Sequence, residues 1–248
     1  MRAFALSLVF VFAPCLWASA AASDAAAPAE DAEFGDFEDE FGGAAEAKKV
    51  FDPLRGYNRF MFKVNDKFYY YLLRPLALHY RFAVPKQART AVSKSFHNLY
   101  FPVRFVNTLL QLKFKKAGME FGRFVVNSSV GVGGLFDPAG RYLKWRPSDE
   151  DFGQTLGHYG MGGGFPVVLP LLGPSNVRDG LALAPDALLN PLSYAVELPM
   201  SVAARAGEKF NYASLHLGEY ESVKKDALDP YTFLRDAYEQ NRDKKIQE

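Results

Sequence analysis

The chain has 248 residues, of which 49% are hydrophobic, 15% aromatic and 23% charged. A chain of this length and composition can form one large domain or two small ones with a sizeable core. Its formal net charge of +1, taken as an average, excludes a protein that coats polyanions and an acidic solvating protein. The single cysteine, Cys15, excludes an internal disulfide framework and a cysteine-clustered zinc or iron–sulfur site.

Residues 1–22 are predicted to be a secretory signal peptide. Arg2 precedes an apolar run over residues 4–13 and a small-residue patch over 18–22, which is the order of such a signal. The apolar run is too short to span a bilayer as a helix, so cleavage is favoured over a retained anchor.

Cys15 is a candidate lipidation site, because bacterial lipoproteins carry their lipid on a cysteine just after the apolar run. Pro14 stands where such proteins have Gly, Ala or Ser. This departure favours ordinary cleavage near Ala20 or Ala22, and lipidation at Cys15 stays open as the alternative.

The near-neutral net charge is the sum of three regions whose charges cancel. Residues 21–50 have a net charge of −7, residues 51–146 a net charge of +13, and residues 147–248 a net charge of −6. Residues 23–49 are acidic and rich in Ala and Gly, a composition that predicts a disordered tether. Phe34, Phe37 and Phe41 within it are either incidental or a short docking motif that becomes helical on a partner.

From residue 51 the pattern is that of amphipathic helices. Asp52 and Pro53 predict a helix start, as N-cap and first helical residue, and the helix is expected to end near Arg74-Pro75. An apolar stripe recurs at spacing four on it: Phe60, Val64, Phe68 and Leu72. The opposite face is polar: Arg59, Lys63, Asn65 and Lys67.

Further helices are predicted from Pro85, after Pro102, and over 116–128, 179–189, 199–217 and from Asp229-Pro230 onward. Their apolar residues are expected to face inward: Val103, Val106 and Leu110, then Phe121, Phe124 and Val125, and finally Tyr231, Leu234 and Tyr238.

Residues 131–173 are rich in glycine, and residues 156–177 contain no Asp, Glu, Lys or Arg. The prolines at 166, 170 and 174 break this apolar stretch too often for a spanning helix. We expect an apolar hairpin instead.

Enzyme chemistry is not indicated. The sequence has neither G-x-S-x-G nor H-E-x-x-H, and its four histidines lie at least 18 residues apart, so no helix presents two of them to one metal. The glycine clusters do not complete G-x-G-x-x-G. We therefore expect no catalytic residues, no metal and no cofactor.

The features that remain favour a protein that binds lipid. A secreted chain with a basic front half, many aromatic residues and amphipathic helices can attract phosphate head groups, whereas secretion makes nucleic acid a poor partner. A soluble helical domain whose aromatics only fill a core stays open as the alternative.

Several long motifs in order resemble the MlaA/VacJ family of outer-membrane phospholipid transport components. The resemblance covers about residues 51–243 and rests on five segments: Phe51-Asp52-Pro53-Leu54-Arg55-Gly56-Tyr57-Asn58-Arg59, Arg74-Pro75, Asp151-Phe152-Gly153-Gln154-Thr155-Leu156-Gly157-His158-Tyr159-Gly160, the run from Leu169 to Asp179, and Asp229-Pro230-Tyr231 with Leu234-Arg235-Asp236-Ala237-Tyr238. One motif departs from the family pattern, which has Gly-Pro-Tyr where this chain has Gly164-Phe165-Pro166.

This resemblance implies an all-α, ring-shaped single helical domain over residues 50–243, with a Gly/Pro-rich apolar hairpin, an amphipathic central channel and a flexible C-terminus at 244–248. It implies removal of mislocalised phospholipids from the outer leaflet, on the periplasmic side of the cell outer membrane. The implied partners are phospholipid, an outer-membrane porin trimer, a periplasmic phospholipid-binding carrier and, indirectly, an inner-membrane ABC transporter. A non-transporting envelope scaffold is the alternative.

The same resemblance suggests site residues. Met61, Val64, Asn65 and Phe68 resemble positions near the family's channel, the alternative being that their helix only packs in the core. Gly160 and Gly162 match family glycines in the hairpin, where they are expected to act as a hinge. Three cations are candidates for head-group attraction or are merely solvated: Arg59, Lys63 and Lys67.

Overall fold

The computed structural model describes residues 50–248. The predicted signal peptide, Cys15 and the acidic segment 23–49 lie outside this part. Within it, helices predominate and two short strands form one antiparallel sheet. The predicted all-α class is confirmed.

The first half of this part is helical throughout. Its elements are α2 (Arg55–Phe68), the π-helical turn η1 (Tyr69–Leu73), α3 (Arg74–Ala83), α4 (Lys86–Leu99), α5 (Phe101–Leu110), α6 (Phe114–Ser129) and α7 (Pro138–Leu143). The second half contains the hairpin between helices. Its elements are α8 (Phe152–His158), β1 (Pro166–Leu169), β2 (Gly173–Asn176), α9 (Val177–Leu189), α10 (Leu192–Ala195), α11 (Leu198–Leu215), α12 (Glu219–Asp226) and α13 (Pro230–Gln247).

The first predicted helix is wrong at both ends. It begins at Arg55 and not after Asp52, because the Asp52 carboxylate accepts hydrogen bonds from Asn58 and Tyr231 and is not free to cap the helix. Its predicted end near Arg74-Pro75 is also wrong. The π-helical turn η1 continues α2 directly into α3, which contains Pro75 in its first turn. A wider π turn accommodates a proline, which has no N–H and crowds the preceding turn of an α-helix.

The predicted apolar hairpin is confirmed as β1 and β2, which pair antiparallel with Pro166 opposite Asn176 and Leu169 opposite Gly173. Leu171 and Leu172 lie at its tip and are exposed. β1 packs against α2, and both strands pack against α9.

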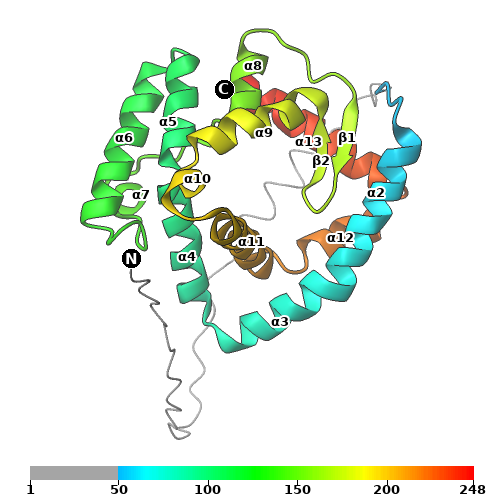
Figure 1. The fold of residues 1–248 in the computed structure, drawn as a ribbon, viewed down its shortest axis with the longest axis horizontal. Helices are drawn as coiled ribbons and strands as arrows, with labels where there is room; N and C mark the ends of the chain where they lie inside the picture. Colours follow the sequence, from blue (N-terminus) through cyan, green and yellow to red (C-terminus); the bar gives the residue numbers. More distant parts are fainter. Residues whose placement is uncertain (1–49) are drawn as a thin grey trace, which may run out of the picture. The chain divides into compact units, whose positions relative to one another are not determined.

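The helices of this unit follow one another around a ring (Figure 1). α2 and α3 form one edge, α5 and α6 the opposite edge, and α8 and α9 a third side, while α10 and α11 lie nearer the middle. The packing of β1 against α2 joins the late part of the chain to its beginning and closes the ring.

The distribution of polar residues is inverted relative to a typical soluble domain. Among the described residues, buried polar and charged side chains outnumber buried hydrophobic ones. On α5 the buried side chains include Arg104, Asn107 and Thr108, and on α6 they include Glu120 and Arg123.

The predicted inward faces of α5 and α6 are therefore wrong for three of the six residues, whereas Val103, Val106 and Phe124 are half-buried. Leu110 is 44%, Phe121 53% and Val125 45% exposed. The charged residues turn inward because they satisfy one another: Arg104 Nε donates to Glu120 at 2.8 Å, and paired, hydrogen-bonded charges can be buried. The predicted inward face of α13 agrees better with the structure, since Tyr231 is buried.

The helical part extends further than predicted at the C-terminus. Residues 244–247, which the sequence assigns to a flexible end, are the last residues of α13. The Ile246 side chain lies against Gly157 of α8, where a Cβ would approach its Cδ1 to 2.5 Å.

Candidate functional site

Two asparagines of α2 hold the hairpin. Asn58 is buried, and its Nδ2 donates to the Pro166 carbonyl at 2.9 Å while its Oδ1 accepts from the Val168 amide at 2.8 Å. Seven residues later, Asn65 donates to the Leu169 carbonyl at 2.9 Å and accepts from the Leu171 amide at 2.8 Å. Residues seven apart lie on the same face of a helix. The two side chains therefore bind β1 and the tip of the hairpin along one face of α2.

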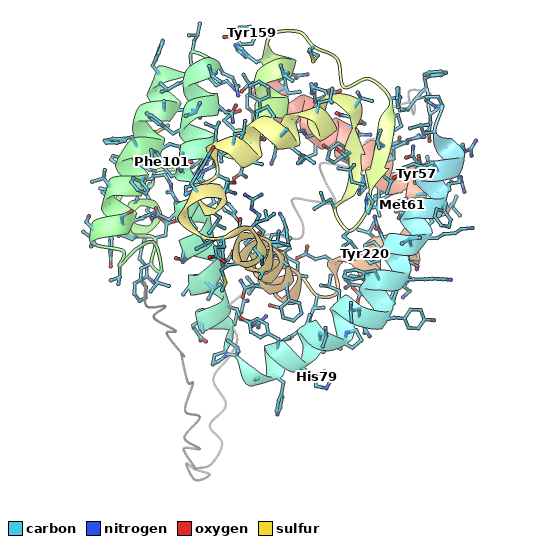
Figure 2. The ribbon with its side chains drawn as sticks, viewed as in Figure 1. Tyr57, Met61, His79, Phe101, Tyr159 and Tyr220 are labelled. Carbon is cyan, nitrogen blue, oxygen red and sulfur yellow. The ribbon has the colours of Figure 1, made fainter. Side chains whose placement is uncertain are left out.

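Of the four predicted channel residues, Asn65 is thus occupied by the hairpin backbone. Met61 and Phe68 are half-buried, and Val64 is 39% exposed. Met61 lies on α2 near Tyr57 (Figure 2). The structure brings these four residues onto one helix beside the hairpin, and their contact with lipid stays a prediction.

The three predicted head-group cations have different surroundings. Arg59 forms an ion pair with Asp229, and its guanidinium lies 5.4 Å from the centroid of the Tyr231 ring. It therefore ties α2 to the start of α13. Lys63 and Lys67 are exposed and remain candidates for attraction of phosphate.

The two predicted hinge glycines also differ. Both lie in the loop between α8 and β1, where an added Cβ would meet nothing within 4 Å. Gly160 has a φ of +87°, a conformation that disfavours L side chains, whereas Gly162 does not. Only Gly160 is required to be glycine by its own backbone.

This loop is anchored at its far end by α9. The Arg178 guanidinium donates to the Met161 carbonyl at 3.1 Å, and the Arg178 amide donates to the Gly163 carbonyl at 3.2 Å. The Asn176 side chain caps α9 by accepting from the Asp179 amide at 2.8 Å.

A buried charge network lies behind the loop. Arg242 of α13 donates to both carboxylate oxygens of Asp151, at 2.7 and 2.8 Å, and its Nε donates to Asp179 at 2.8 Å. Asp179 also pairs with Arg178 at 3.0 Å. Burial alone would raise the pKa of Asp151 and of Asp179, but the hydrogen bonds and charge of Arg242 outweigh it and hold both below their ordinary value.

A cavity of about 580 Å³ lies between α4, α5, α9 and α11, elements that surround one side of the ring interior in Figure 1. Its volume is within the range of small-molecule sites, about 300–1,000 Å³. Most of the residues that line it are charged or polar: His97, Tyr100, Arg104, Asp149, Glu150, Asp151, Asp186, Asn190, Arg205, Glu208, Lys209 and Tyr212.

Asp186 stands out among the carboxylates of this cavity. It accepts hydrogen bonds from the Phe152 amide at 3.1 Å and from Asn107 Nδ2 at 3.0 Å. Burial raises the pKa of Asp186 to about 6, and the charge of nearby Asp151 adds to the rise.

The ring exposes many large apolar side chains. Phe82 of α3 is 95% exposed, and it lies one helical turn from His79, which points away from the ring in Figure 2. Similar exposure recurs on most elements, at Tyr71, Leu112, Phe114, Phe136, Leu171, Leu181, Leu198 and Met200. Soluble monomers rarely expose such large apolar areas unless they serve as an interaction site. No helix over residues 50–248 combines the length and apolar character needed to cross a membrane.

The fold and these surfaces define a class of protein: a helical ring, closed by a short hairpin, whose buried side chains are mostly polar and which exposes many large apolar ones. The sequence model of the MlaA lipoprotein family matches residues 50–245. The chain belongs to this family.

Relatives in other bacteria support the same membership. An uncharacterised protein of Rickettsia bellii is 36% identical over 203 residues, covering 81% of this chain and 78% of the relative. The intermembrane phospholipid transport system lipoproteins MlaA of Shigella flexneri and Escherichia coli are 36% and 35% identical, each covering 77% of both chains.

A solved structure from work on the structural basis for maintenance of bacterial outer membrane lipid asymmetry has the same fold. Its TM-score is 0.71 at 35% identity, and the match covers 79% of this chain and 99% of that chain. The ring-shaped helical fold expected from the sequence is therefore confirmed.

Three residues that organise the site were not predicted from the sequence: Asn58, Arg205 and Arg242. Asn58 carries a usable signal, because it stands seven residues before Asn65 and therefore lies on the same face of the helix. Arg205 and Arg242 carry none, since their partners lie elsewhere in the chain and an arginine on a helix is ordinarily solvated.

Proposed function

We propose that this chain is the outer-membrane component of an intermembrane phospholipid transport system, acting on the periplasmic side of the cell outer membrane. It removes mislocalised phospholipids from the outer leaflet and passes them to a periplasmic carrier, which maintains the lipid asymmetry of the membrane. The names of the relatives from Shigella flexneri and Escherichia coli support this role.

The observation that carries the proposal is the inverted polarity of the ring. Exposed apolar side chains are stabilised by lipid tails or by an apolar partner, and the cavity between α4, α5, α9 and α11, lined largely by charged and polar residues, has room for a polar head group. In this proposal the ring lies within one side of the membrane, as amphipathic elements do.

The movement of lipid needs no covalent step. Met61, Val64 and Phe68 provide an apolar strip beside the hairpin, against which acyl tails slide, and Lys63 and Lys67 attract phosphate at its exposed side. The hairpin borders this strip, and the loop with Gly160 leads into the hairpin, so a small displacement of the loop would move the hairpin and open or close the strip.

The proposed partners are those that the family resemblance implies. An outer-membrane porin trimer covers part of the apolar exterior, a periplasmic phospholipid-binding carrier receives the lipid, and an inner-membrane ABC transporter acts downstream of that carrier. Attachment through a lipid on Cys15 is compatible with the position of the ring, and mass spectrometry of the mature N-terminus tests it.

The test is purification of the full chain from outer membranes in a mild detergent, followed by identification of what comes with it. Co-purification of phospholipid and a porin is expected. In a strain without the gene, outer-leaflet phospholipid should rise and return to normal when the gene is restored. A lipid-free soluble monomer with unchanged asymmetry in the deletion strain would instead favour a scaffold.

A further inference from the structure

Arg205 of α11 is held in the cavity by a neutral partner and not by a carboxylate. Its Nη2 donates to Ser193 Oγ at 2.6 Å, and Ser193 in turn donates to the Ala187 carbonyl. Its Nε is buried and has no hydrogen-bond partner. A buried donor without an acceptor is costly, on the order of 1–3 kcal/mol. The hydrogen bond to Ser193 therefore holds the Arg205 guanidinium in one orientation, and its Nε still lacks a hydrogen-bond acceptor.

Glu208 lies one helical turn after Arg205, on the same face of α11. Its side chain is 16% exposed, and its nearest cation is Lys209 at 3.8 Å, whose own side chain is 70% exposed. A pair of this length with a solvated lysine contributes little. The carboxylate is thus largely enclosed without a close cation.

Most other charges of the cavity are already compensated. Arg104 pairs with Glu120 at 2.8 Å, Glu150 with Lys113 at 3.1 Å, and Asp151 with Arg242. Asp149 has only longer pairs, at 3.8 Å. The groups that remain to face a ligand include the cation Arg205 and the anions Glu208 and Asp186.

Tyr100 lines the same cavity as Arg205 and Glu208, and the charges of both act on its hydroxyl group. Burial raises the pKa of Tyr100, the charge of Glu208 adds to the rise, and the charge of Arg205 opposes it. The two charges of α11 therefore lie close to the same wall of the cavity, within the span of one small ligand.

We propose that this cavity is a head-group subsite that selects phospholipids with a zwitterionic phosphoethanolamine head group over those with an anionic phosphoglycerol head group. Arg205 binds the phosphate, for which a planar guanidinium is well suited, and Glu208 with Asp186 accepts the terminal ammonium. A phosphoglycerol head group carries the same single phosphate charge but ends in neutral hydroxyls, so it offers no positive charge to these carboxylates. The inference rests on the proposed transport of phospholipid and specifies its substrate class.

The test uses the full chain in mild detergent, equilibrated with vesicles of equal parts phosphatidylethanolamine and phosphatidylglycerol. The bound lipid is then extracted and quantified by mass spectrometry. The wild-type protein is expected to retain phosphatidylethanolamine in about fivefold to tenfold excess, since one charge contact differs between the lipids.

Two substitutions separate the two contacts. Glu208→Gln should bring the ratio of the bound lipids close to that of the vesicles while lipid stays bound. Arg205→Gln should reduce the total bound lipid about tenfold, and Arg205→Lys, which keeps the charge, should restore part of it. Arg81→Gln and Asp226→Asn change exposed charges outside the cavity and should have no effect. Thermal unfolding of each variant verifies that it is folded.

The outcomes are distinct. A wild-type protein that binds both lipids equally overturns the selectivity while leaving phospholipid transport intact, and one that binds no lipid overturns both. Glycerophosphoethanolamine has the same head group without acyl chains. If it bound as tightly as the lipid, the cavity would serve a soluble phosphodiester, and the proposal of a lipid subsite would be wrong.

Discussion

Arg242 is the residue on which the closure between α8, α9 and α13 depends most directly. It neutralises Asp151 and Asp179 together, and its own side chain is only 10% exposed. Gly153 and Gly157 fit this arrangement, because a Cβ on Gly153 would approach Asp179 Oδ1 to 2.3 Å and a Cβ on Gly157 would meet Ile246 of α13. Gly153 and Gly157 thus allow α8 to pack closely against α9 and α13, and Arg242 stabilises this packing.

Replacing Arg242 by Met should lower the free energy of unfolding by about 3–5 kcal/mol, because two carboxylates lose their buried partner. Chemical denaturation in mild detergent measures this change. Arg141→Met removes an exposed arginine and should change stability by less than about 0.5 kcal/mol. Equal effects of the two substitutions would show that the buried network does not stabilise the fold.

The raised pKa of Asp186 predicts how the stability of the protein depends on pH. Its folded-state pKa of about 6 lies above the ordinary value of 3.8, so the folded chain binds this proton more tightly than the unfolded chain. The stability that Asp186 contributes is fully present below pH 3.8 and is lost as pH rises through about 6. Asn at this position stays neutral and keeps an acceptor oxygen for the Phe152 amide.

The stability of Asp186→Asn relative to wild type should therefore rise between about pH 4 and about pH 7. Thermal unfolding midpoints across this range, taken as differences between the two proteins, remove the contributions of the other carboxylates. Asp226→Asn, at an exposed position, should give a difference that does not vary with pH. A flat profile for Asp186→Asn as well would contradict the raised pKa.

At the scale of elements, the junction of α2 and the hairpin depends on side-chain amides more than on apolar contact. Asn58→Leu removes the acceptor of the Val168 amide and the donor to Pro166. Hydrogen exchange over residues 166–171 should then become about tenfold faster, since each lost hydrogen bond is worth about 1 kcal/mol. Lys63→Gln, on an exposed position of the same helix, is the control. Unchanged exchange after Asn58→Leu would mean that other contacts hold the hairpin.

The loop before β1 gives a second prediction at this scale. Gly160→Val should impair the control of outer-leaflet phospholipid in a complementation assay, because a β-branched residue at a φ of +87° strains the backbone by about 1–3 kcal/mol. Gly162→Val should be nearly silent, since its backbone and surroundings accept a side chain. Gly160→Asn should act less strongly than Val, because Asn tolerates the left-handed region. If both valine variants left asymmetry unchanged, the hinge hypothesis would fail.

At the scale of the whole molecule, the apolar exterior predicts association with membranes without spanning them. Phe82→Asp should weaken binding to phospholipid vesicles about tenfold or more, because an exposed phenylalanine loses about 1.5–3 kcal/mol of burial in lipid and a charge replaces it. Vesicle flotation measures the change. Gln87→Asp, an exposed position on α4, adds the same charge and should have little effect. Equal binding by all three proteins would place Phe82 outside the membrane contact.

The sequence by itself determined the helical class, the hairpin and the family. Prolines at 85, 102 and 230 mark helix starts that the structure places within one or two residues, because proline constrains the backbone locally whatever the fold. The ordered motifs around residues 51–59, 151–160 and 169–179 identified the family before any contact was known.

Only the tertiary structure decided which face of each helix turns inward. An amphipathic period is the same whether its apolar or its polar side is buried, so Phe121 and Val125 were expected inside and lie outside. Likewise Arg205, Arg242 and Asn58 acquire their roles from atoms far away in sequence, such as Ser193, Asp151 and the backbone of β1. Local patterns fix where a helix begins, whereas the pairing of buried charges is a property of the closed ring.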